Sequence, residues 1–365
     1  MNLILRKYAS LLVDYCLDIQ TGEKLYIKSS TAGEPLVKEV YRAAIKKGAI
    51  VEYDLIFSEE SRIRLHNSKD DQLKHVPTLN AHAIENFDAF LMIRAPHNLL
   101  ENHANDPEKI KIINKALKPI SDNYRRRTAE GTLKRSLCQY PTQASAQMAG
   151  MSLEEYTFFV FNACRLFDEN PEASWLKVRE DQQRFVDHLD QVDLVRYVGP
   201  KTDISFRVKG RKWMNSDGRT NMPSGEVFTG PIEDSVNGQV YFSYPSVFMS
   251  KAVQGILLKV VDGKVMEWSA EVGQEVLDEV FKVPGARYFG EVAIGTNYNI
   301  KQATKNILFD EKIGGTIHMA VGQSYLQTGG KNESDIHWDM ITDMTDGGQI
   351  YTDGNLIYEN GKFLI

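Results

Sequence analysis

The sequence predicts two domains of different fold class. The N-terminal one is an α/β domain with a mostly parallel sheet, and the C-terminal one is a β-rich, barrel-like domain of α+β character. Three observations predict this. The chain has 365 residues, more than one hydrophobic core usually holds. Helix-like and strand-like patterns alternate in the first half, as in βαβ units. Near residue 193 they give way to apolar–polar alternation broken by glycine and aspartate turns, so we expect domains at 1–192 and 193–365.

The elements of the first half follow from local patterns. The chain opens with an amphipathic helix that ends near the Thr-Gly-Glu at 21–23. A helix with Pro35 in its first turn and Gly48 at its end is predicted over 34–48. Polar helical segments separate and follow the strands, which are predicted at 24–30, 50–57 and 87–95.

Two longer helices precede the change of character. Ser152 and Glu155 form a capping-box pattern that opens a helix at 153, and a second helix is predicted over 171–192. In the second half, VVDGKV at 260–265 and IYENGKFLI at 357–365 have Asp-Gly and Asn-Gly turns, which predict β-hairpins. One helix is expected near 271–282.

Composition excludes several classes of function. The net charge of −6 argues against a large surface for nucleic acid or anionic membrane, since both need clustered Lys and Arg. No stretch has the ~18 uninterrupted apolar residues of a membrane span, and the start does not have the pattern of a signal peptide. Cys16, Cys138 and Cys164 form no CxxC motif or even-numbered set, which favours a reducing cytoplasm. GxGxxG, P-loop and HExxH motifs are absent.

The segment SDIHWDM places His337 and Asp339 two positions apart. In a strand such residues lie on the same face, so an imidazole and a carboxylate could converge on a metal ion. The alternative is a hydrogen-bonded pair near a strand end. His318, in the strand-like GGTIHMAVGQSY, is a further candidate ligand or a satisfied core histidine. The other histidines lie in polar segments without a companion pattern and are not expected to be ligands: His66, His75, His82, His97, His103 and His188.

Two glutamates lie among apolar residues. Glu226 is in NMPSGEVFTGP and Glu291 is in YFGEVAIGTN. A carboxylate in such surroundings is normally paired or bound to a cation, so each is either part of a buried salt bridge or a metal ligand. Together with His318, His337 and Asp339 they provide three carboxylates and two imidazoles, which is the ligand set of a two-metal site. The C-terminal domain is therefore the expected metal-binding catalytic domain.

Four segments, NMPSGEVFTGP, FGEVAIGTN, IHMAVGQSY and SDIHWDM, resemble in order and approximate spacing the metal-site motifs of the thermophilic-type metalloaminopeptidases, peptidase family M29. VGPKTDISF resembles the start of that family's catalytic domain, and the clear similarity covers about 195–365. The resemblance implies five metal ligands, with Glu291 between the two metals. These are Glu226, Glu291, His318, His337 and Asp339. It also implies that Tyr325 is the active-site tyrosine.

The function implied by this resemblance is a metal-dependent aminopeptidase that releases N-terminal amino acids. Two divalent ions, of cobalt, zinc, manganese or magnesium, would activate a shared water molecule. Glu291 is the candidate for proton transfer, and the Tyr325 hydroxyl would stabilise the oxyanion. The expected substrates are peptides with a free N-terminus, and the family relationship implies a homodimer.

Two other interpretations remain open. His318, His337 and Asp339 also resemble the facial triad of a mononuclear non-haem iron ring-cleaving dioxygenase, but such a site has no need of Glu226 and Glu291. Iron bound at one ion per chain, with oxygen consumption, would favour that enzyme. A non-catalytic peptide-binding protein with a structural metal is the second interpretation. Structural zinc sites usually have closed Cys/His ligand sets, whereas this cluster is rich in carboxylates.

Overall fold

The computed structural model describes residues 2–101, 106–248 and 251–365. Two compact units make up the chain. The first consists of residues up to 172 together with 218–223, and the second consists of 173–217 and 224–365. In the described part of the chain, no helix combines the length and apolar character that crossing a membrane requires.

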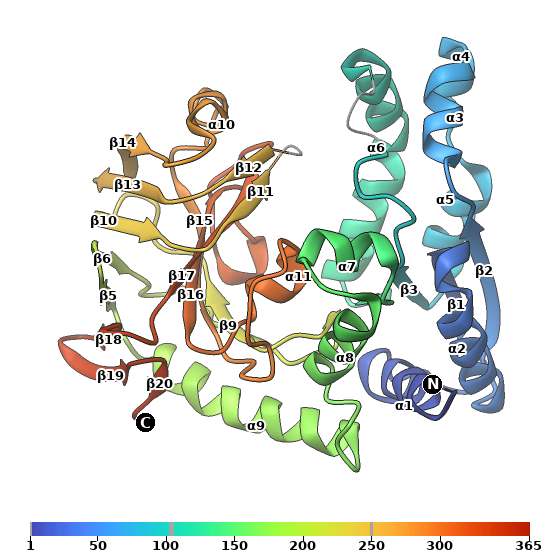
Figure 1. Ribbon diagram of the computed structural model, residues 1–365, viewed down its shortest axis with the longest axis horizontal. Helices are drawn as coiled ribbons and strands as arrows, with labels where there is room; N and C mark the ends of the chain where they lie inside the picture. The colour runs from blue at the N-terminus through green and yellow to red at the C-terminus, as the bar shows by residue number, and fades with distance from the viewer. Residues whose placement is uncertain (1, 102–105, 249–250) are drawn as a thin grey trace. The chain divides into compact units, whose positions relative to one another are not determined.

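The first unit is built on a parallel sheet of five described strands (Figure 1). The strands lie in the order β2-β1-β3-β4-β8, and each neighbouring pair is parallel. Apolar residues of β1 and β3 are almost fully buried, as expected for central strands of a parallel sheet. The bounds are β1 Lys24–Ser30, β2 Ile50–Ile56, β3 Ala89–Arg94, β4 Lys134–Gln139 and β8 Asn221–Met222.

Helices connect the strands of the first unit. The opening helix continues as a π-helical turn, η1 (Leu11–Cys16), whose apolar residues are buried. The predicted capping box is present, because Ser152 and Glu155 each accept a backbone N–H from the other residue. The helices are α1 Asn2–Ser10, α2 Glu34–Lys46, α3 Glu60–Asn67, α4 Asp70–Leu73, α5 Thr78–Asn86, α6 Pro107–Ala129, α7 Gln143–Ala149 and α8 Leu153–Ala163.

The larger sheet of the second unit is antiparallel. Its described strands lie in the order β14-β13-β10-β6-β5-β18-β19-β20. Both predicted hairpins occur here, with positive φ at Asp262-Gly263 and Asn360-Gly361. The bounds are β5 Leu194–Gly199, β6 Thr202–Arg207, β10 Asn237–Phe242, β13 Ile256–Val261, β14 Lys264–Ser269, β18 Gln349–Thr352, β19 Asn355–Glu359 and β20 Lys362–Phe363.

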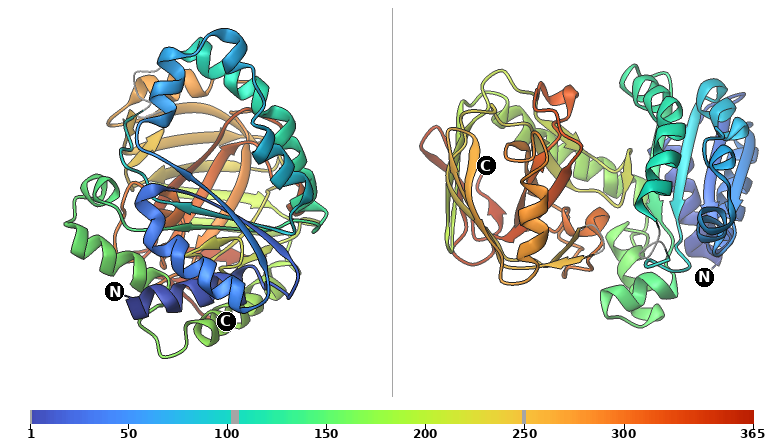
Figure 2. Two further views of the ribbon diagram at one scale, coloured as in Figure 1. Left: turned by 90° about the vertical axis from the view of Figure 1, so that its right-hand side faces the viewer. Right: turned by 90° about the horizontal axis from the view of Figure 1, so that it is seen from above.

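The second sheet of this unit has the order β17-β16-β15-β9-β7 and is also antiparallel. Apolar residues of both sheets contribute to one core, around which the sheets curve (Figure 2). The bounds are β7 Met214–Ser216, β9 Glu226–Thr229, β15 Phe289–Gly295, β16 Thr316–Gly322 and β17 His337–Asp343. The remaining elements are the 3-10 turn η2 Thr31–Gly33 of the first unit and, after it, α9 Pro171–Leu189, β11 Ser246–Phe248, β12 Lys251–Val253, α10 Gln274–Val280, α11 Ile307–Asp310 and the 3-10 turn η3 Leu326–Thr328.

The predicted fold class is confirmed, with a parallel α/β N-terminal part and a β-rich C-terminal part. The expected boundary at 192/193 differs from the division between the compact units. Nearly all of α9 lies in the second unit, because Val186 and Leu189 join its core and Gln182 donates hydrogen bonds to Asn215 and Ser216. Residues 218–223 belong to the first unit, because β8 extends its sheet beside β4. The short helix α11 was not predicted.

Candidate metal centre

The strand register of the five-stranded sheet places the predicted ligands on one face. Residues directly opposite each other in an antiparallel pair point to the same side. Ala320 lies opposite both Glu291 and Asp339, which puts these two carboxylates on one face. The other predicted ligands follow by the same alternation, since Ala293 pairs with His318, Gly295 with Glu226 and Gly322 with His337.

The opposite face of this sheet is apolar and forms part of the core. Its side chains are Val227, Val292, Ile294, Ile317, Met319, Val321, Trp338 and Met340. The sheet therefore separates a hydrophobic face from a face of carboxylates and imidazoles. On the polar face, Ala293 and Ala320 carry only a methyl group each, which leaves room between the larger side chains.

A β-bulge at Gly290 determines which way Glu291 points. Phe289 pairs with Val321 and Glu291 with the next residue, Ala320, so Gly290 is the extra residue. Phe289 and Glu291 would share a face in a regular strand, but the bulge sends Phe289 into the core and Glu291 to the polar face. A Cβ atom at Gly290 would lie 2.4 Å from the Gln323 carbonyl oxygen, so only glycine fits.

Glu291 lies at the centre of the cluster, with one oxygen near each imidazole. Its Oε1 is 3.5 Å from His318 Nε2, and its Oε2 is 3.3 Å from His337 Nε2. Glu226 Oε2 lies 3.4 Å from His318 Nε2, and Asp339 Oδ1 lies 3.6 Å from His337 Nε2. The structure thus brings together all five side chains that the sequence analysis selected.

The donor atoms of the cluster fit metal ions. Glu226 Oε2, Asp339 Oδ1 and both ring nitrogens of His318 are buried and make no hydrogen bond within the described residues. Buried polar atoms normally have a partner, and a metal ion would supply one here. His337 Nδ1 lies 2.8 Å from the Gln323 carbonyl oxygen, which can only accept a hydrogen bond. Nδ1 therefore carries the proton, and Nε2 is left to face the carboxylates, as in many metal-binding histidines.

The charges of the cluster shift its pKa values strongly. Burial acts to lower the pKa of His318, but the carboxylates of Glu291 and Glu226 outweigh it and raise that pKa to about 9. Burial also acts to lower the pKa of His337, but the carboxylates of Asp339 and Glu291 outweigh it and raise that pKa to about 12. Burial acts to raise the pKa of Asp339, but His337 lowers it to about 2. In the absence of metal ions, the imidazoles therefore hold protons at neutral pH.

Two further charged residues of the cluster were not predicted. Glu311 can present an oxygen within 4.8 Å of ligand atoms of His318 and Asp339. The buried Lys312 forms ion pairs with Glu226 and Glu311. In the segment FDEKIGG, Glu311 stands between the charged residues Asp310 and Lys312, a run that is typical of a solvated surface. The criterion that selected Glu226 and Glu291, a single carboxylate among apolar residues, therefore does not select Glu311 or Lys312.

Tyr325 follows β16 and lies beside the cluster. Its ring centroid is 5.0 Å from that of His337 and 5.6 Å from that of Phe228, whose side chain is on the polar face. Desolvation and the nearby carboxylates, Glu291 and Asp339 foremost, raise the pKa of Tyr325 well above its ordinary value. The hydroxyl therefore keeps its proton and can donate a hydrogen bond.

The histidines that were not expected to be ligands lie outside this cluster. His97 contacts Thr31, His82 contacts Asn86, and His188 contacts Thr352 through hydroxyl or amide groups. His103 lies outside the described residues. Within the described ranges, the groups of potential metal ligands draw only on Glu226, Glu291, Glu311, His318, His337 and Asp339.

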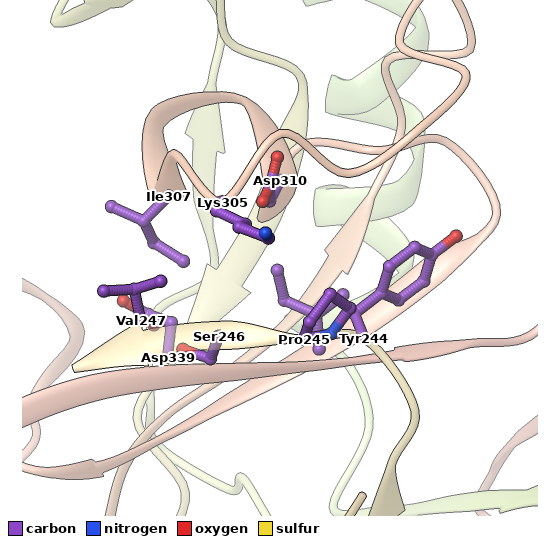
Figure 3. Close-up of a pocket in the computed structure, with 9 residues that line it drawn as sticks. Tyr244, Pro245, Ser246, Val247, Lys305, Ile307, Asp310 and Asp339 are labelled. Atoms are coloured by element: carbon purple, nitrogen blue, oxygen red, sulfur yellow. The ribbon is translucent and has the colours of Figure 1, made fainter. Parts of the chain in front are cut away.

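A hollow opens beside Asp339 (Figure 3). Its empty volume is about 320 Å³, including the part open to solvent. Ile307, Lys305 and Asp310 lie on one side of the hollow, and the chain segment Tyr244–Val247 lies on the other. Ile341, two residues after Asp339 on β17, also lines it. The hollow therefore lies next to one of the predicted ligands.

The sequence matches the family described as thermophilic metalloprotease (M29) over residues 2–363. The chain belongs to the M29 family. Aminopeptidase 2 of Geobacillus stearothermophilus is 29% identical to this M29 protein, over 94% of this chain and 92% of its own length. The resemblance inferred from the four motifs is therefore confirmed for the whole chain, and the enzyme class is that of a metallopeptidase.

Two solved structures share the fold of this M29 protein. AmpT from Thermus thermophilus is 23% identical with a TM-score of 0.86, and the likeness covers 100% of this chain and 99% of that chain. The 2,5-dihydroxypyridine dioxygenase from Pseudomonas putida KT2440 is 13% identical with a TM-score of 0.60, over 100% and 98%. At these identities the likeness shows the fold alone. The chemistry of this chain therefore depends on its own residues.

Proposed function

We propose that this M29 metallopeptidase is an aminopeptidase that removes N-terminal amino acids from peptides at a centre of two divalent metal ions. The proposed ligands are Glu226, Glu291, His318, His337 and Asp339, with Glu311 as a further candidate. The observation that carries the proposal is the position of Glu291 between His318 and His337, with one carboxylate oxygen near each. The name of the Geobacillus relative, aminopeptidase 2, supports the substrate class.

The arrangement of the ligands supports two ions. Two groups of potential ligands share Glu291, one with Glu226 and His318 and the other with His337 and Asp339. A carboxylate has two oxygens and can bind one ion with each, whereas a site for a single ion has no need of this sharing. Mixed oxygen and imidazole ligands are compatible with cobalt, zinc, manganese or magnesium, because such sites do not discriminate sharply between these ions.

The chemistry divides between the ions and the protein. When bound, divalent ions make a water molecule more acidic and polarise the carbonyl group of a peptide bond. With an oxygen that is not engaged by an ion, Glu291 would take the proton from the attacking water and transfer it to the amine that leaves as the C–N bond breaks. The Tyr325 hydroxyl would donate a hydrogen bond to the oxyanion. A carboxylate of the cluster could bind the free α-amine of the substrate, which would restrict cleavage to the N-terminal residue.

The dioxygenase interpretation is less well supported. An iron(II) facial triad would use His318, His337 and Asp339 alone. Each of the three groups of potential ligands in the described chain contains a glutamate instead. The fold likeness to the dihydroxypyridine dioxygenase does not distinguish the two chemistries, because the fold is shared with AmpT as well.

Two further parts of the proposal concern the state of the protein in the cell. We propose a homodimer, on the basis of the family relationship, and light scattering of the purified protein would test it. We also propose that the protein works in the cytoplasm, since an odd number of cysteines with no CxxC motif suits a reducing compartment. Fractionation of the source cells would test this location.

The first experiment measures hydrolysis of aminoacyl-p-nitroanilides and short peptides. The chelated protein is assayed before and after addition of cobalt, zinc, manganese or magnesium, with N-acetylated peptides as the control. The proposal predicts metal-dependent release of single N-terminal residues and no cleavage of the acetylated peptides. Cleavage of acetylated peptides would contradict an aminopeptidase. Oxygen consumption with one bound iron per chain would favour the dioxygenase.

A further inference from the structure

Lys312 is a fully buried lysine within the acidic cluster. Only 1% of its side chain is exposed, and its Nζ lies 2.6 Å from Glu226 Oε1. The same ammonium group pairs with Oε1 of Glu311. The Lys312 backbone is also held, since its N–H donates to the Phe309 carbonyl and its carbonyl accepts from Asn297. Lysine is almost never fully buried without such partners.

The ammonium group lies among four carboxyl groups and two imidazoles. Four carboxylates share this part of the unit, and burial strengthens their mutual repulsion. They belong to Glu226, Glu291, Glu311 and Asp339. In the described chain, Lys312 Nζ is the one lysine or arginine nitrogen within 4.0 Å of any of them. The two histidines are the other sources of positive charge.

Lys312 contacts Glu226 at the oxygen that faces away from the imidazoles. Oε1 binds the ammonium group, whereas Oε2 lies 3.4 Å from His318 Nε2 and makes no hydrogen bond. The lysine thus takes one oxygen of Glu226 and leaves the other for the centre. This division holds the carboxylate in one orientation before any ion binds.

We propose that Lys312 is a positioning residue, a built-in counter-ion that holds Glu226 and Glu311 in place in the metal-free protein. The part of this proposal that concerns the metal-bound protein rests on the proposed metal centre. Without ions, loss of the ammonium group leaves buried carboxylates uncompensated, which is strongly destabilising. Bound divalent ions supply positive charge to the same carboxylates. The contribution of Lys312 to stability is therefore largest when the centre holds no metal.

The test is thermal unfolding of Lys312→Met and wild type, each after chelation and after addition of Mn²⁺ or Co²⁺. We expect the metal-free variant to melt roughly 5–10 °C below the metal-free wild type. Added metal should reduce this difference to less than half. Lys305→Met is the matched control, because Lys305 is an exposed lysine that forms no ion pair within the described chain. It should melt like the wild type in both states.

A second comparison separates charge from packing. Glu311→Gln/Lys312→Met removes one carboxylate together with the ammonium group and should melt above Lys312→Met in the metal-free state. Lys312→Arg, which keeps the charge, should also melt above Lys312→Met. The proposal is overturned if the Lys312→Met deficit is the same with and without metal. It is also overturned if the double variant melts no higher than Lys312→Met.

The measurements distinguish a variant that fails to fold from a protein that binds no metal. If Lys312→Met folds only with metal, chelation should unfold it and leave the wild type folded; unfolding of both would contradict the proposal. If metal does not raise the melting temperature of the wild type, the proposed metal centre fails. The metal-free difference between Lys312→Met and the double variant then still decides whether Lys312 acts as a counter-ion.

Discussion

Ala293 lies directly opposite His318 in the pairing of β15 with β16. Both residues are fully buried, so the imidazole faces a single methyl group on the neighbouring strand. Small residues at this position and at Ala320 keep the polar face of the sheet open between its carboxylates and imidazoles. The capacity to bind metal ions therefore depends on the small alanine side chains as well as on the carboxylates and imidazoles.

Ala293→Leu should abolish or strongly reduce metal binding. The larger side chain would occupy the space beside His318, while the core face of the sheet stays unchanged. Metal content per chain after loading and gel filtration measures the effect. Met319→Leu is the control, since Met319 points into the core from the neighbouring position of β16 and should keep full metal content. Full loading of Ala293→Leu would contradict the proposed position of the ions.

Gly290→Ala should lower both stability and metal affinity. The added Cβ would lie 2.4 Å from the Gln323 carbonyl oxygen, so the bulge that orients Glu291 must shift. We expect a loss of about 1–3 kcal/mol in the free energy of unfolding. Chemical denaturation and metal titration measure the two effects. Gly199→Ala in β5, whose new Cβ would lie 3.6 Å from Met344 Sδ, should change little.

Metal binding should release protons. The pKa of His318 is raised to about 9 and that of His337 to about 12 in the metal-free protein, and a metal-bound imidazole nitrogen cannot keep its proton. Apparent affinity should therefore rise as pH rises from 6.5 toward about 9, by about tenfold per pH unit for each proton released. Calorimetry in buffers of different ionisation enthalpy counts the protons. An affinity independent of pH would contradict imidazole ligation.

Tyr325→Phe should lower kcat by about 100-fold to 1000-fold with a smaller effect on KM, because the hydroxyl is assigned to oxyanion stabilisation. Steady-state kinetics on a cleaved aminoacyl-p-nitroanilide would measure this. Metal content should stay that of the wild type, since the phenol is not among the proposed ligands. Tyr351→Phe in β18, whose hydroxyl donates to Gln349, is the control and should be fully active. Equal activity of both variants would remove Tyr325 from the mechanism.

Glu291→Gln should reduce turnover by at least ~1000-fold and lower metal content per chain, because the amide can neither accept the proton nor bridge two ions. Glu275→Gln on α10, an exposed glutamate, is the matched control and should behave like the wild type. Retention of both ions with loss of turnover would restrict Glu291 to proton transfer. Retention of full activity would contradict both proposed roles.

Local sequence patterns determined most of the secondary structure and the chemical types of the candidate site. Period-two alternation and Asp-Gly or Asn-Gly turns predicted the hairpins, and the Ser152–Glu155 pair predicted the cap of α8. These features depend on neighbours within a few residues, which the sequence displays directly. Charged residues among apolar ones likewise marked Glu226 and Glu291, because burial of an unpaired carboxylate is costly.

Tertiary structure alone decided where these side chains point and which residues join them. Alternation would place Phe289 and Glu291 on one face, and the bulge at Gly290 separates them. Lys312 meets Glu226 across 86 residues of sequence, and residues 218–223 leave the second unit to extend the first sheet. The physical reason is the same in each case. Strand pairing, bulges and buried ion pairs are contacts between distant segments, and the periodicity of one segment does not specify its partner.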